Sequence, residues 1–455
     1  MSSLTASLAT ALSGLTAEQG ALQATTNNVA NVNTPGYSRE IPVMVASDPI
    51  VIAPLTLGTG VTLKSIESVR DAILESRIQQ ETQSQGQWNA LVAALTQAQV
   101  SFTGNTGDIG TALSNFFDSI NQLSASPADL SLRQNVLTAA GNMATAFNGA
   151  ANRLTSQRSN IDQSVEQTVG QINQLTGQIA KLNGQISSLE NVGNAAGTFL
   201  DQRNQLIDQL SALIDVAVIP SDNTLTLTTA NGTPLVAGQQ SFALSYELDS
   251  GVQHITSQGN DITSSLVSGE LGGLLQTRDQ QIPAILAKLD TLAAGVSTAV
   301  NGVQIAGYDV NGNAGTNLFS TPPADGAGAA QAMSVIISDP TLLAASSDNN
   351  AGDNANAEAL YALRNQAIIQ GQSPTDYYSG IVFDVGNATA NASAQQNASS
   401  LVLQQLNDQR NAISGVSLDE EAANMMRYQQ AYAASAQVVS TINSMMQTLL
   451  NMKSS

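Results

Sequence analysis

The sequence LTASLATALSGLTAEQGALQATTNNVANVNTPGY, residues 4–37, carries leucines in steps of four, three and seven residues. These steps place the leucines on one face of a helix. The apolar pattern stops at residues 33–36, where Asn-Thr-Pro-Gly gives a strong helix-stop and turn signal. The stretch therefore predicts an amphipathic N-terminal helix that ends just before Pro35.

The C-terminal segment repeats this design. Apolar residues keep heptad spacing from Leu418 almost to the last residue, which is typical of a coiled-coil helix. Ser417 is a suitable N-cap, and Glu420 and Glu421 fall in the first turn, where acidic side chains favour a helix start. The heptad residues that we single out are Leu418, Met425, Tyr432, Val439, Met446 and Leu450.

Both terminal segments are nearly free of charge. Glu18 is the only charged residue in 1–38, and Arg427 is the only one in 422–452. A solvated surface helix normally carries charges opposite its apolar stripe, whereas Ser, Thr, Asn and Gln can be buried when they find partners. We expect these helices to be surrounded by protein after self-assembly. The candidate assembly interface comprises Leu8, Leu12, Leu15, Leu22, Asn28, Asn31, Pro35, Gly36 and Tyr37 together with the C-terminal heptad residues.

The fold class predicted is mainly α, with a nested multi-domain architecture. Heptads over 161–189 indicate an intramolecular helical bundle, while residues 216–262 alternate like short strands between turn signals. The predicted domains are terminal coiled-coil helices for axial assembly at 1–40 with 415–455, a helical-bundle body at 41–215 with 269–414, and a small inserted β-module at 216–268. Within the body, residues 41–68 are expected to be extended.

Composition excludes several classes of function. The 455 residues have a formal net charge of −20, which argues against a nucleic-acid partner and an anionic membrane surface. No run approaches the ~20 apolar residues of a membrane span, and the first 22 residues lack the features of a cleaved signal peptide. With no cysteine and only one histidine, His254, the usual zinc sites and nucleophile–histidine triads cannot be built. We therefore expect no enzyme, no cofactor and no metal site.

The ends of the chain resemble a known family. Its N-terminal signature matches 12–15 and 27–39, and its C-terminal signature matches 414–422 and 427–432, as in flagellar rod, hook and hook-associated proteins. Residues 200–206, 272–275 and 307–315 are similar to the hook-associated members. Some members carry a further inserted domain near 321–331, where this chain has only a short segment.

The resemblance implies a structural adaptor that joins the flagellar hook to the filament by self-assembly at the hook tip. It implies type III export without a cleaved signal and an extracellular location in the flagellum. The partners implied are further copies of the chain, hook protein, the next hook-associated junction protein, the filament cap protein during assembly, and an export chaperone. Two alternatives stay open: another axial protein, such as a rod or hook subunit, and a secreted coiled-coil adhesin or effector.

Overall fold

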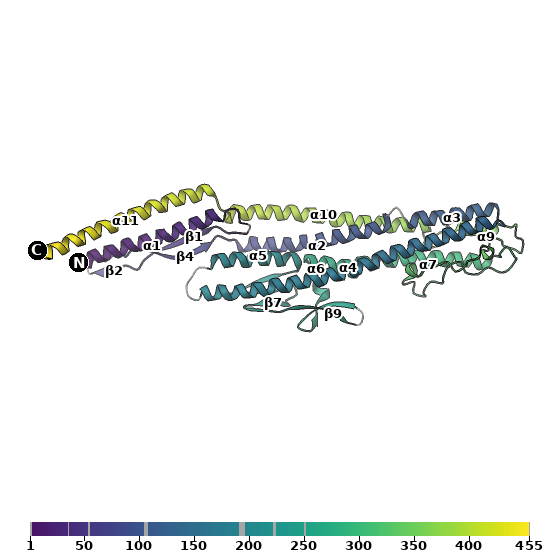
Figure 1. Ribbon diagram of the computed structural model, residues 1–455, viewed down its shortest axis with the longest axis horizontal. Helices are drawn as coiled ribbons and strands as arrows, with labels where there is room; N and C mark the ends of the chain where they lie inside the picture. The colour runs from purple at the N-terminus through teal and green to yellow at the C-terminus, as the bar shows by residue number, and fades with distance from the viewer. Residues whose placement is uncertain are drawn as a thin grey trace.

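The computed structural model describes residues 2–34, 36–52, 55–103, 108–190, 196–221, 224–249 and 252–454. The molecule is long and narrow, and its two termini lie together at one end (Figure 1). The chain is mainly helical, as predicted, with small antiparallel sheets.

The terminal region is a layered structure of two helices and a hairpin. Helix α1 packs along α11, and its other side packs on strands β1 and β4, so α1 lies between α11 and the hairpin. The predicted terminal helices are confirmed, and the predicted extended segment forms the hairpin. The bounds are α1 (Ser2–Ala30), β1 (Glu40–Ala46), β2 (Ile50–Ile52), β3 (Leu55–Leu57), β4 (Val61–Ser68) and α11 (Leu418–Ser454).

The body is a bundle of long helices. Helix α2 packs on α10, while α4 runs most of the length of the body and contacts α3 and α5. At 1.5 Å per residue, the 61 residues of α4 span about 90 Å. The long helices are α2 (Ala72–Thr103), α3 (Ile109–Ala125), α4 (Leu130–Glu190), α5 (Gly197–Leu213), α7 (Ile282–Ala306) and α10 (Pro374–Ser414), and the shorter α6 (Gly269–Gln276) packs on α2. Short turns complete it: η1 (Thr263–Ser265), the π-helical turn η2 (Thr277–Gln281), α8 (Ala329–Ala332), η3 (Pro340–Leu342) and α9 (Ala355–Ala362).

Two sheets form where the sequence alternates. The first has the order β5-β6-β7-β8 and the second the order β11-β10-β9, with all neighbours antiparallel. Their bounds are β5 (Ala217–Ser221), β6 (Thr224–Thr228), β7 (Pro234–Ala237), β8 (Gln240–Ser241), β9 (Leu244–Asp249), β10 (Val252–Ser257) and β11 (Asn260–Asp261). Leu225, Leu235 and Ile255 of these strands belong to the same continuous apolar core as α3, α4 and α7. The division into domains stays a prediction.

One segment differs from the expectation about membrane spans. By length and hydropathy alone, Gly269–Ala306 could cross a membrane. In the fold, Leu289, Leu292 and Val296 of this segment are fully buried against the rest of the core. The need to fill a core therefore accounts for its hydropathy, as it does for the central helices of many folded domains.

Candidate assembly interface

The heptad positions of α11 face α1 within the same chain. A Cβ added at Gly14 of α1 would lie 3.4 Å from Oγ of Ser435, which identifies the face of α11 that meets α1. Tyr432, Val439 and Met446 share this face by helical spacing, and all three are half-buried, while Ile442 is buried. These residues therefore have an intrachain partner in the structure.

The other predicted residues of the two helices differ in exposure. Leu8, Leu15, Leu22 and Met425 are half-buried. Leu12 remains 47% exposed, and Leu418 and Leu450 are also exposed.

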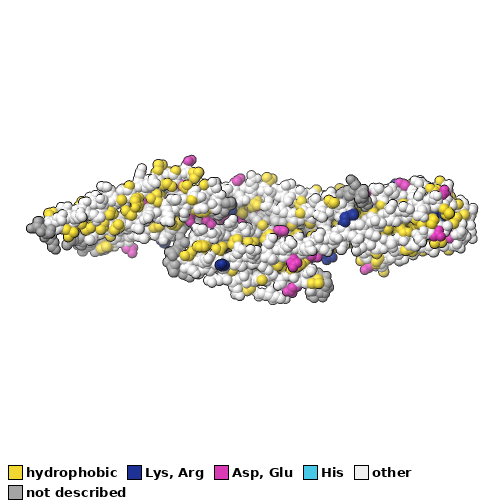
Figure 2. Space-filling model, in the orientation of Figure 1, with side chains coloured by type: hydrophobic (Ala, Val, Ile, Leu, Met, Phe, Trp, Pro, Cys, Tyr) yellow, Lys and Arg dark blue, Asp and Glu magenta, His cyan; other side chains and the backbone are white. Residues whose placement is uncertain are grey.

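A second apolar row on α11 is exposed. We call it the outer stripe, and it consists of Val438, Met445, Leu449 and Met452. Val438 is 49% exposed and Met445 is 50% exposed, although each lies directly beside a residue that packs toward α1. Figure 2 shows apolar side chains gathered along this end of the molecule. The predicted heptad residues do not include this row, although steps of seven, four and three residues between its members place them on one face of the helix.

Glu18 and Arg427, the only charged residues of 1–38 and 422–452, interact with each other. Burial raises the pKa of Glu18, and the positive charge of Arg427 acts in the opposite direction. The guanidinium of Arg427 lies 4.9 Å from the centre of the Tyr428 ring. Between the acidic first turn of α11 and Lys453 near its end, the two helices thus carry one acid and one base, which attract each other across the pair.

Asn28 fixes the end of α1 to the first strand. Its Nδ2 donates to the carbonyl oxygen of Glu40 at 2.8 Å, and its Oδ1 accepts from the N–H of Glu40 at 2.8 Å and from the Tyr37 hydroxyl at 2.9 Å. The side chain is 1% exposed. A single amide thereby supplies both hydrogen bonds that a neighbouring strand would otherwise give to Glu40.

The turn after α1 contains the remaining predicted site residues. Asn31 Nδ2 donates to the carbonyl oxygen of Asn27 at 3.0 Å, and its Oδ1 accepts from the Thr34 hydroxyl at 3.1 Å. Gly36 has φ of +78°, a conformation that favours glycine. Pro35 lies outside the described residues.

An arginine joins the hairpin to the start of α11. Arg39 Nε donates to Glu421 at 2.9 Å, and a second guanidinium nitrogen lies 2.7 Å from Glu420. The backbone N–H of Arg39 donates to the carbonyl oxygen of Ser414 at 2.9 Å. Burial, with the nearby charges of Glu40 and Glu421, raises the pKa of Tyr37. The acidic first turn of α11 therefore binds Arg39 of the hairpin and also interacts favourably with the helix dipole.

Beneath the turn lies a cavity of about 300 Å³ between the terminal region and the body. Its lining includes Arg70, Glu75, Asp208 and Arg410. Arg70 Nε donates to Ser38 at 3.0 Å, and the same guanidinium pairs with Asp201. Burial, followed by the charge of Glu75, raises the pKa of Asp208 to about 6. We call Arg70, Glu75, Asp208 and Arg410 the joint cluster.

The described part of the chain holds no group of three or more His, Cys, Asp or Glu side chains placed for a metal ion. His254 Nδ1 lies 2.9 Å from Asp261, its neighbour in the second sheet. His254 and Asp261 are thus engaged in a contact within the sheet. The residues of the terminal region described above likewise make contacts between parts of the protein.

Profiles of three protein families match the chain. The flagellar hook-associated protein FlgK helical domain matches residues 95–319. The flagella basal body rod protein matches 8–37, and the flagellar basal body rod FlgEFG protein C-terminal region matches 409–452. The two short matches cover the segments where the sequence resembles the axial signatures.

Curated relatives match over nearly the full length. Flagellar hook-associated protein 1 of Bacillus subtilis strain 168 is 31% identical, with 99% of each chain covered. The protein of the same name from Escherichia coli strain K12 is 28% identical, with 97% of this chain and 99% of the relative covered.

Among solved structures, the flagellar hook junction protein FlgK from Burkholderia pseudomallei shares the fold with a TM-score of 0.67 at 18% identity. The match covers 74% of this chain and all of that one. The chain belongs to the family of flagellar hook-associated protein 1, and it is a structural, non-enzymatic hook–filament junction protein of the extracellular bacterial flagellum.

Proposed function

We propose that copies of this chain assemble with one another at the hook tip through the terminal region. In each copy, the inner face of α11 pairs with α1, and the outer stripe is buried against neighbouring copies. The observation that carries this proposal is an apolar row left exposed on α11 within 422–452, where Arg427 is the only charged residue. Exposed apolar surface of this kind marks a contact site for protein.

The partners expected from the resemblance belong to the same proposal. Hook protein lies below the ring of copies, the next hook-associated junction protein lies above it, and the filament cap protein is present during growth. An export chaperone covers the terminal helices before secretion. The exposed apolar residues of α1 and α11 support these assignments, because such surfaces need cover both in the cell and in the flagellum.

The test places a carboxylate in the outer stripe. Met445→Asp should prevent incorporation into the junction, because assembly would bury an unpaired charge at a cost of several kcal/mol. Met445→Leu is the matched control and should assemble, since it keeps an apolar side chain of similar volume. The measurement is electron microscopy of flagella from a null strain complemented with each variant, beside melting curves of the purified proteins.

Substitutions at two neighbouring valines, Val438 and Val439, test the two faces of α11 separately. Val438→Asp should block assembly and leave the monomer's melting temperature within about 2 °C of wild type, because Val438 is already exposed. Val439→Asp should also loosen the pairing of α1 with α11 inside the monomer. Normal filaments on cells that carry Met445→Asp or Val438→Asp would refute the role of the outer stripe.

A further inference from the structure

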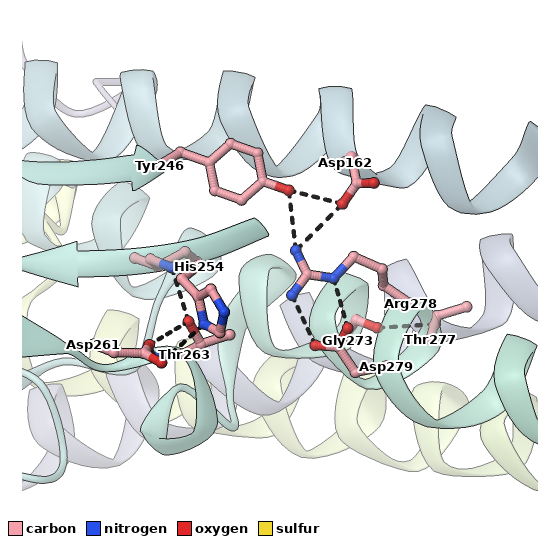
Figure 3. A network of polar contacts seen from close by, with 10 residues as sticks. Asp162, Tyr246, His254, Asp261, Thr263, Gly273, Thr277, Arg278 and Asp279 are labelled. Carbon is pink, nitrogen blue, oxygen red and sulfur yellow. Dashed lines mark hydrogen bonds and ion pairs between the residues drawn. The ribbon is translucent and has the colours of Figure 1, made fainter. Parts of the chain in front are cut away.

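A buried arginine lies where the helical body meets the second sheet. Arg278 belongs to the π-helical turn η2 between α6 and α7, and it is 2% exposed. Figure 3 shows its guanidinium facing the Tyr246 hydroxyl of β9 and the Asp162 carboxylate of α4. The chain has 15 Lys and Arg residues. Because such residues are almost never fully buried unless they are paired, the burial of Arg278 requires an explanation.

The guanidinium contacts three elements at once. Nε and one terminal nitrogen donate to the two carboxylate oxygens of Asp279 at 2.7 and 2.8 Å. The other terminal nitrogen donates to the Tyr246 hydroxyl at 3.0 Å and to Asp162 of α4 at 3.3 Å. Tyr246 in turn donates to the same oxygen of Asp162 at 2.7 Å. The five bonds join β9, α4 and η2 in one closed network, which we call the Arg278 network.

The π-helical turn is held in place from the other side. Thr277 Oγ1 donates to the carbonyl oxygen of Gly273 at 2.9 Å. A Cβ at Gly273 would clash with the carbonyl oxygen of Gln87, so α6 lies in close contact with α2. The turn interrupts an otherwise continuous helical segment, and single π-helical turns of this kind are rare and frequently lie at functional sites. Arg278 thus projects from a fixed base.

Apart from this network, the described residues of the second sheet and of the turn after it attach to the body mainly through buried apolar side chains. Leu244 and Ile255 are buried at one end, and Asn173 of α4 binds the backbone N–H and C=O of Leu244 at 2.8 and 2.7 Å. Toward the β9–β10 turn the sheet leaves the core, and Leu248 is 66% exposed. Tyr246 is half-buried and pairs directly with the buried Ile255 of β10, so the Arg278 network lies at the edge of the buried part of the sheet.

We propose that Arg278 is a latch that holds strands β9–β11 on α4, and that its loss frees this sheet as a unit while the helical body stays folded. An apolar side chain could fill the same space, but it could not select one orientation of Tyr246 and Asp162. Buried ionic groups can serve to specify one arrangement in this way. The inference is independent of the assembly proposal, since it concerns the monomer.

The test is hydrogen exchange on the full-length monomer with Arg278→Met, which keeps much of the side-chain length and removes the charge. Backbone amides of β9 and β10 should exchange at least about tenfold faster, while those of α10, α3 and β5–β8 keep their wild-type rates. Arg364→Met is the matched control. It breaks an exposed pair with Asp118 at 2.6 Å and should leave β9 and β10 unchanged.

A milder variant keeps the proposal testable if Arg278→Met does not fold. Tyr246→Phe retains the ring and removes only the hydroxyl, so it should raise exchange in the same strands by a smaller factor. Either of two results would overturn the latch. One is unchanged exchange in β9 and β10 in both variants, and the other is an increase spread evenly over α4, α7 and the sheets.

Discussion

Asparagine side chains of the helices serve as partners for non-helical backbone. Asn28 binds both backbone groups of Glu40, Asn173 does the same for Leu244, and Asn301 donates to and accepts from Phe319 at 2.9 Å. An amide can do this because it carries a donor and an acceptor side by side, and unlike a charge it is buried at moderate cost. The low charge and high asparagine content of the chain thus have a structural explanation. The sequence pointed to Asn28, but its partner Glu40 depends on the return of the chain in three dimensions.

Asn28→Asp tests this function of asparagine. The change replaces the Nδ2 donor with an oxygen, so the buried carbonyl of Glu40 loses its hydrogen bond. We expect the terminal region to lose about 1–3 kcal/mol, measured by chemical denaturation and by hydrogen exchange of β1. Asn31→Asp, three residues along, is the control, because Asn31 bonds only within its own turn. Equal effects of the two changes would show that the Asn28–Glu40 hydrogen bonds do not contribute more to stability than those of Asn31.

At the scale of the element, the repeat identified the helices but not their neighbours. Heptads predicted α1 and α11, but a seven-residue repeat does not indicate whether the helix that packs on it belongs to the same chain. The heptads of 161–189 are only the second half of α4, since residues 130–160 carry many small side chains that blur the period. Helix α9 is short, because it ends at Ala362 and the chain then turns, with Gln370 at φ of +48°.

Close helix crossings depend on glycine at chosen positions. Gly86 of α2 lies against α5 and α6, where an added Cβ would clash with the carbonyl oxygen of Ala212. Gly170, on the exposed side of α4, has open space around it. Two identical substitutions should therefore have opposite effects on stability.

Gly86→Ala should destabilise the body by about 1–3 kcal/mol, because the two helices must move apart. Gly170→Ala should stabilise it by up to about 1 kcal/mol, because alanine favours the helix and meets nothing. Both values come from urea unfolding followed by circular dichroism. A stabilising Gly86→Ala would mean that the crossing of α2 and α5 is looser than described.

At the scale of the whole molecule, the order of the segments could be predicted from the sequence, but the continuity of the apolar core between them could not. Charge-poor heptads at both ends and a strand pattern between helices predicted which segments differ in secondary structure. The sequence did not indicate that Leu225, Leu227 and Leu235 would share one core with α4, because a period of two reveals a buried face and not what covers it. The sequence did not indicate the joint cluster either. Its four members are 5 to 340 positions apart along the chain, and they form no motif.

The joint cluster makes the attachment of the terminal region depend on pH. Burial, then the charge of Glu75, raises the pKa of Asp208 to about 6, while Arg410 and Arg70 oppose the shift. Burial also raises the pKa of Glu75. Because the folded state prefers both groups protonated, their contribution to stability is fully present below the unfolded pKa values of about 4. The contribution of Asp208 is lost as the pH rises through about 6, and that of Glu75 is lost as the pH rises through its own raised pKa.

We therefore expect Asp208→Asn to stabilise the joint at pH 7.5 and to have almost no effect at pH 4. The gain at pH 7.5 should stay below about 3 kcal/mol, the limit set by a shift of about two pH units. The measurement is the free energy of unfolding across pH 4–8 for wild type and variant, taken as a difference so that the general effect of net charge cancels. Asp48→Asn removes an exposed carboxylate of the hairpin and serves as the control for that general effect. A difference between wild type and Asp208→Asn that stays constant across this range would show that Asp208 does not titrate within the joint.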